Sequence, residues 1–98
     1  GAEHAPGWSL EALRYIYEER GAAANGHETL DTDASCLVRE NGDLVCERYV
    51  LSQGKVQIEL LNNLDKVHPT GAILVAAWPN IEGANGLPVR VVAIQPVK

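Results

Sequence analysis

Apolar residues recur at helical spacing near the start of the chain and at alternating spacing in several later segments. Between residues 10 and 20 they fall three or four positions apart, which predicts an amphipathic helix. Ser9 is a suitable N-cap for this helix, and Gly21 follows its last residue. Residues 1–8 precede the cap and are expected to form a flexible lead.

Two runs that alternate apolar and polar residues flank Asn41 and Gly42, which predicts a β-hairpin. A three-residue loop with Gly42 in the left-handed bulge position would set Cys36 opposite Cys46, within the range that a disulfide bridges. A two-residue Asn-Gly loop would put the two thiols on opposite faces. We therefore expect a bulged hairpin stapled by a Cys36–Cys46 disulfide, with two reduced, buried cysteines as the alternative.

Three later segments predict further strands. Residues 55–61 alternate apolar with polar positions, and residues 72–78 form the most apolar run of the chain. Residues 87–94 are expected to form the last strand, with Pro88 at its start and Pro96 after its end. A run without alternation is typical of a central strand that is covered on both faces. Residues 21–33 and 79–86 are rich in Gly, Ala and Asn and are expected to be loops, with a short helical turn over residues 22–24 as the alternative for the first.

These elements fit one α+β domain that comprises residues 1–98. Its N-terminal helix is expected to pack on an antiparallel sheet of about five strands, and the stapled hairpin supplies the first two of them. The 46% hydrophobic content supports a globular chain rather than a disordered one.

Charge and cysteine content bear on partners and compartment. The net charge is −5 and the eight basic residues are scattered, which argues against a nucleic-acid groove and against binding to anionic membranes. No run reaches the roughly 20 apolar residues that span a bilayer. Two cysteines placed for a bridge point to an oxidising compartment, so we expect a secreted, periplasmic or cell-surface protein.

The acidic loop between the helix and the hairpin was considered as a metal site. Its candidate ligands are Glu28, Asp31 and Asp33, with His27 nearby. Their spacing lacks the DxDxDG pattern and distal Glu of a calcium loop, so a solvated acidic loop without a metal is expected. No cofactor is expected either.

Catalytic motifs are missing from the sequence, which contains no GxSxG, HExxH or CxxC pattern. Glu59, His68 and Arg90 could serve as the acid, base and cation of a small hydrolase or nuclease. Strand positions alone do not bring these side chains together, and this function ranks third.

Aromatic and polar residues on the outer face of the hairpin and in the loop after residues 72–78 are candidates for a binding surface. They are Arg39, Glu47, Tyr49, Trp78, Asn80, Glu82 and Asn85. The leading prediction is therefore an exported, non-enzymatic module of effector, inhibitor or adaptor type. Its partner would be another protein, with a glycan as the alternative.

A helix followed by an antiparallel sheet resembles the soluble head of a type IV pilin or pseudopilin. In this resemblance residues 10–20 would be the end of the long pilin helix, and residues 21–35 the loop between helix and sheet. The resemblance implies a structural subunit that polymerises through that helix, which is the alternative function. The size and the predicted single disulfide are also similar to those of small secreted effectors of plant pathogens.

Overall fold

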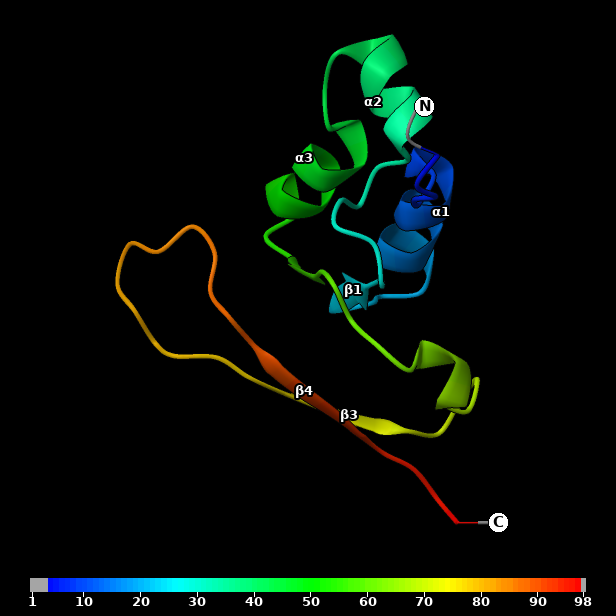
Figure 1. Ribbon diagram of the computed structural model, residues 1–98, viewed down its shortest axis with the longest axis vertical. Helices are drawn as coiled ribbons and strands as arrows, with labels where there is room; N and C mark the ends of the chain where they lie inside the picture. Colours follow the sequence, from blue (N-terminus) through cyan, green and yellow to red (C-terminus); the bar gives the residue numbers. More distant parts are fainter. Residues whose placement is uncertain (1–3, 98) are drawn as a thin grey trace. The chain divides into compact units, whose positions relative to one another are not determined.

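The computed structural model describes residues 4–97, which divide into two compact units, one up to Asn62 and one from Asn63 (Figure 1). Each unit is described by itself. The first contains, in chain order, α1 (Leu10–Arg14), the π-helical segment η1 (Tyr15–Glu19), β1 (Ala24–Gly26), α2 (Ser35–Asn41), α3 (Val45–Ser52) and β2 (Val56–Ile58). The second contains the short 3-10 helix η2 (Leu64–Lys66), β3 (Ile73–Ala77) and β4 (Arg90–Ile94). Within residues 4–97, no helix combines the length and the apolar character needed to cross a membrane.

The first helix begins where the sequence predicts it. The Ser9 hydroxyl accepts a hydrogen bond from the backbone N–H of Ala12 at 3.1 Å, which satisfies one of the free donors of the first turn. α1 continues directly into η1, and Gly21 follows with φ +66°, a left-handed conformation that suits glycine at a helix end.

The predicted hairpin of residues 36–46 is wrong, because this segment belongs to two helices, α2 and α3. Gly42 does adopt a left-handed conformation, with φ 64° and ψ 23°, but it ends α2, and its N–H donates to the carbonyl oxygen of Val38 at 2.8 Å. The predicted disulfide is also wrong. Cys36 is an exposed free thiol on α2, and Cys46 is a buried free thiol on α3.

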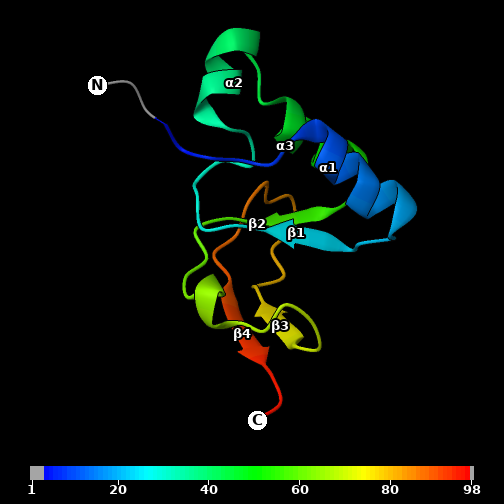
Figure 2. The same cartoon turned by 90° about the vertical axis from the view of Figure 1, so that its right-hand side faces the viewer.

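The two helices lie in the connection between two parallel strands, β1 and β2 (Figure 2). Their register pairs Ala24 with Val56, and hydrogen bonds of His27 with Ile58 and Leu61 extend the ladder beyond the strands. A parallel pair needs a long crossover, and residues 27–55 supply one. Residues 21–33 were expected to form a loop or a short helical turn over Ala22 to Ala24, which is wrong where the chain forms β1.

The core of the first unit lies between the first helical segment and α3. Its buried apolar residues are Leu13, Tyr17, Cys46 and Val50. Cys46 and Val50 are four positions apart and share one face of α3, so helical spacing directs both into the core. Trp8 and Tyr49 are partly buried and pack against this cluster.

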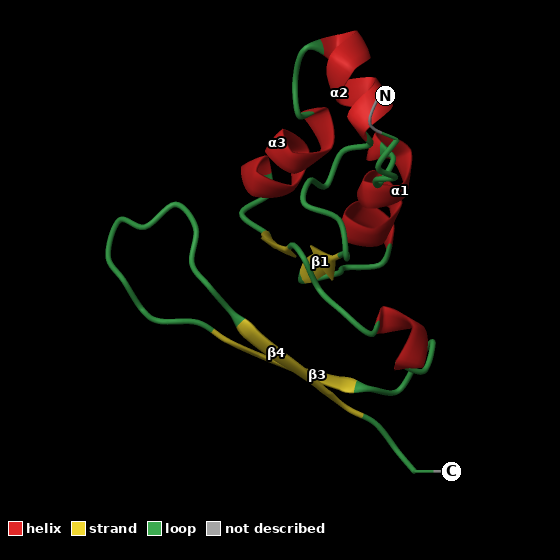
Figure 3. Ribbon diagram, in the orientation of Figure 1, coloured by secondary structure: helices red, strands yellow, loops and turns green. Residues whose placement is uncertain are grey.

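The second unit contains one antiparallel pair of strands, in which Ile73 pairs with Ile94 and Ala77 with Arg90 (Figure 3). Strands in this region were predicted correctly. The predicted sheet of about five antiparallel strands is wrong, because residues 4–97 form two separate sheets of two strands each. β3 is also not covered on both faces, since Ile73 and Leu74 are 65% and 55% exposed.

Candidate functional site

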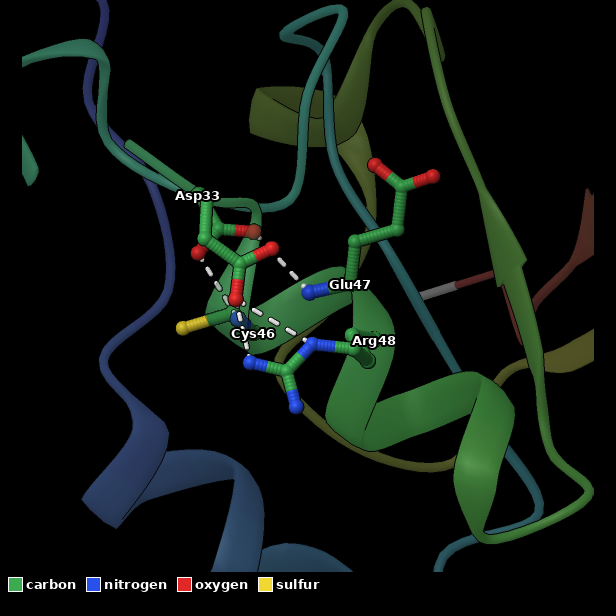
Figure 4. Close-up of polar contacts among 5 residues, drawn as sticks. Asp33, Cys46, Glu47 and Arg48 are labelled. Atoms are coloured by element: carbon green, nitrogen blue, oxygen red, sulfur yellow. Dashed lines mark hydrogen bonds and ion pairs between the residues drawn. The ribbon is translucent and has the colours of Figure 1, made fainter. Parts of the chain in front are cut away.

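Asp33 holds the beginning of α3 with both of its carboxylate oxygens (Figure 4). One oxygen accepts from the backbone N–H of Cys46 at 2.7 Å, and the other accepts from the N–H of Glu47 at 2.9 Å. Leu44, which immediately precedes the helix, offers no side-chain cap. Asp33 is 3% exposed, so a buried carboxylate from a distant loop replaces the usual capping residue.

A neighbouring segment holds the backbone of Asp33 in place. The N–H of Trp8 donates to the carbonyl oxygen of Thr32 at 2.8 Å, and the N–H of Ser35 donates to that of Ala5 at 3.1 Å. Trp8 and Asp33 also form a parallel bridge. The loop that carries Asp33 is therefore fixed on both sides of this residue.

Glu47 lies in the first turn of α3, and its side chain leaves the helix on the side away from the Arg48 guanidinium (Figure 4). Arg48 pairs instead with Asp43. Within residues 4–97, the half-buried Glu47 carboxylate makes no hydrogen bond and no ion pair. An acid of this kind is free to exchange a proton with another molecule.

The surroundings of Glu47 favour its protonated form. Burial raises the pKa of the carboxyl group, the negative charges of Glu59, Asp31 and Asp33 raise it further, and the nearby His27 acts in the opposite direction. The helix dipole favours a negative charge in a first turn and acts in the opposite direction.

The His27 ring lies near the Glu47 carboxylate and is held by contacts within the protein. Its ring Nδ1 lies 2.9 Å from the carbonyl oxygen of Thr29, which can only accept, so Nδ1 carries a hydrogen. The ring Nε2 lies 3.1 Å from the Thr32 hydroxyl, which donates to the Gln57 side-chain oxygen at 2.5 Å. Both ring nitrogens of His27 therefore already have partners within the protein.

Glu47 is one of the residues that line a shallow surface depression. Its lining comes from the start and one side of α3: Asp43, Leu44, Glu47, Arg48, Leu51 and Ser52. Asp31 and Asp33 line a second depression, together with residues of the N-terminal segment. No group of three or more His, Cys, Asp or Glu side chains suited to a metal ion is found within the described part of the chain.

The other predicted binding residues lie on different elements of the two units. Arg39 is exposed on α2, and the Tyr49 hydroxyl on α3 donates to the Glu18 carboxylate at 2.8 Å. The remaining four lie exposed in the connection after β3, in the second unit: Trp78, Asn80, Glu82 and Asn85. Their role in binding stays a prediction.

The sequence does not predict that the carboxylates of Asp31, Asp33 and Glu59 act on Glu47, although each of these residues is a candidate for some other role. Asp31 and Asp33 were considered with His27 as cation ligands, and Glu59 as part of a nuclease site. The parallel pairing of β1 with β2 is what brings these segments to α3. A parallel pair has no local signal comparable to a hairpin turn.

Isatin hydrolase from Roseibium aggregatum is similar to nearly the whole of this chain. It is 29% identical over 93 residues, which cover 95% of the chain and 35% of that protein. The chain therefore spans about a third of the length of this relative. No protein-family model matches the sequence. No solved structure matches it significantly.

Proposed function

We propose that this chain is part of a hydrolase that opens a cyclic amide of the isatin kind, and that Glu47 is its acid–base group. The observation that carries the proposal is the Glu47 carboxyl itself, half-buried, unpaired within residues 4–97 and surrounded by other carboxylates. Similarity to an isatin hydrolase along 95% of the chain supports the choice of reaction.

Hydrolysis of a cyclic amide requires a group that first takes a proton and then returns it. A water oxygen bonds to the carbonyl carbon while a base removes one of its protons. The carbon–nitrogen bond then breaks as the same proton passes to the leaving nitrogen. One water is consumed and no oxidant is needed. A carboxyl group whose pKa is raised above the ordinary value for Glu serves both steps better than an ordinary surface Glu.

Neighbouring side chains are less suited to these steps. Burial, followed by the charge and hydrogen bonding of Asp33, raises the pKa of the Cys46 thiol to about 11. This thiol also donates to the carbonyl oxygen of Trp8 at 3.3 Å, so it stays protonated and is a poor nucleophile. His27 has both ring nitrogens occupied. Glu47 therefore remains the group that is free to act.

Isatin turnover by the purified protein tests this proposal. We expect the Glu47→Gln variant, which keeps the side-chain shape but cannot take a proton, to lower kcat by about 10²- to 10⁴-fold. Glu40→Gln is the matched control, because Glu40 is an exposed Glu at the far end of α2. Absence of turnover with isatin and related fused cyclic amides would contradict the proposal, as would full activity of Glu47→Gln.

Protein binding is the second candidate function. It is favoured by the connection between β3 and β4, where Trp78 and Ile81 are 49% and 57% exposed. Export is not supported by a disulfide, because Cys36 and Cys46 are free thiols. Loss of binding in a Trp78→Ala variant, without loss of folding, would support this function.

A further inference from the structure

We infer that Asp33 is a positioning residue for Glu47: its buried carboxylate holds the first turn of α3 and fixes the direction in which the Glu47 side chain leaves the helix. The inference rests on the proposed function of Glu47. It adds a residue that does not touch the substrate and acts through the group that does.

The two hydrogen bonds of Asp33 make this contact specific. One of them is made to the backbone N–H of Glu47 itself, and the other to the preceding Cys46. Two N–H donors on one carboxylate fix both the position and the rotation of the first turn. A single-oxygen cap from Ser or Thr would leave one of these donors without this partner.

The burial of the Asp33 carboxylate costs free energy unless both of its oxygens accept hydrogen bonds. Asp33 is 3% exposed, and the charge of a buried carboxylate has to be balanced by strong hydrogen bonds. The N–H groups at the start of α3 and the positive end of the helix dipole provide this balance. The Asp33 carboxylate and the first turn of α3 therefore stabilise each other.

Gly7 shows how closely the N-terminal segment approaches the backbone of Asp33. A Cβ atom at Gly7 would lie 2.2 Å from the backbone nitrogen of Ala34 and 2.4 Å from the carbonyl carbon of Asp33. These distances are far below van der Waals contact, so any larger residue at position 7 would move Asp33. The closeness of the two segments therefore requires glycine and holds the backbone of Asp33 firmly.

The Asp33 carboxylate also acts on Glu47 through its charge. Glu47 faces Glu59 from the end of β2, His27 from the end of β1, and Asp31 and Asp33 from the loop before α2. Burial and the three carboxylates raise the pKa of Glu47, and His27 lowers it. Removal of the Asp33 charge should thus lower the pKa of Glu47 and weaken its hold on a proton.

The test compares Asp33→Asn with the control Asp65→Asn in the intact protein. Asn keeps the size of the side chain and one acceptor oxygen but removes the charge. Asp65 is an exposed Asp in η2, away from these contacts in sequence. The measurements are the Glu47 pKa, followed by ¹³C NMR of the labelled side-chain carboxyl, and the pH profile of kcat.

We expect Asp33→Asn to lower the Glu47 pKa and to lower kcat at neutral pH at least tenfold, with a smaller change in KM. Asp65→Asn should change none of these. A folded Asp33→Asn protein with the Glu47 pKa and kcat of the unchanged chain would overturn the inference. A purely structural cap predicts lower stability with both values unchanged.

Gly7→Ala provides a second test that leaves every charge in place, and it replaces the first if Asp33→Asn does not fold. The control is Gly86→Ala, because a Cβ at Gly86 would meet nothing within 4 Å. We expect Gly7→Ala to lower kcat at least tenfold and Gly86→Ala to have no effect. Normal kcat in a folded Gly7→Ala protein would contradict the inference.

The two proposals fail in different ways. If Asp33→Asn shifts the Glu47 pKa while Glu47→Gln stays fully active, Asp33 positions a residue that does not catalyse, and the proposed function is wrong. If Glu47→Gln is inactive while Asp33→Asn behaves as the unchanged protein, the proposed function stands and the role of Asp33 is refuted.

Discussion

Leu13 contributes a large share of the stability of the first unit. It is fully buried in the cluster formed with Tyr17, Cys46 and Val50, so Leu13→Ala removes buried methyl groups and leaves a cavity. Comparable substitutions cost about 3 to 5 kcal/mol. A unit of some 60 residues has a free energy of unfolding of about 3 to 9 kcal/mol, so the variant should lose a large fraction of this stability.

The matched control is Leu51→Ala, because Leu51 lies on α3 and is 56% exposed. The chemical change and the effect on helix propensity are the same in both variants. Urea unfolding followed by far-UV circular dichroism gives the free energy of unfolding of each protein. We expect a loss of about 3 kcal/mol for Leu13→Ala and under about 1 kcal/mol for Leu51→Ala. Equal losses would refute the described core.

Three further predictions follow from the caps, thiols and carboxylates of the first unit. A thiol reagent at pH 8 should modify Cys36 quickly and Cys46 only after unfolding, because Cys46 is buried and its pKa is raised to about 11. A count of zero thiols in the unfolded, unreduced protein would contradict the two free cysteines. Ser9→Ala should lower the free energy of unfolding by about 1 kcal/mol, measured by urea unfolding, and no change would contradict the N-cap. Since the pKa of Glu47 is higher in the folded state, its stabilising effect is present at acidic pH and is lost as pH rises through that pKa. Glu47→Gln should therefore be more stable than the unchanged protein at pH 7 but not at pH 4, and the opposite order in thermal melts would contradict the shift.

The start of α1 and the position of β3 were predicted correctly because residues within or next to these elements determine them. Ser9 and the spacing of the apolar residues after it placed the start of α1, and the apolar run before Trp78 placed β3. Both features are decided by neighbours within a few residues. They were therefore readable without knowledge of the tertiary structure.

Gly42 shows why the central segment was misassigned. A left-handed glycine suits a bulged hairpin loop and the end of a helix equally well, and short apolar runs fit either a strand or a helix. The decision comes from tertiary packing, since helical spacing buries both Cys46 and Val50 against Leu13. The disulfide prediction depended on the hairpin register and was lost with it.

The sequence pointed to single residues of the candidate site but not to the contacts between them. Glu47 was chosen as a binding residue, and Asp33 as a possible cation ligand. Their actual relation is a contact across 14 positions between a loop and the first turn of a helix. Such a contact follows from the path of the chain, and no spacing rule encodes it.

The pH dependence of kcat/KM for isatin hydrolysis tests the role of Glu47, because it reports the ionisation of the essential group in the free protein. We expect the rate to rise with pH through the pKa of Glu47 measured by ¹³C NMR, above the ordinary value for Glu, and this rise to disappear in Glu47→Gln. An identical pH profile in the two proteins would contradict it.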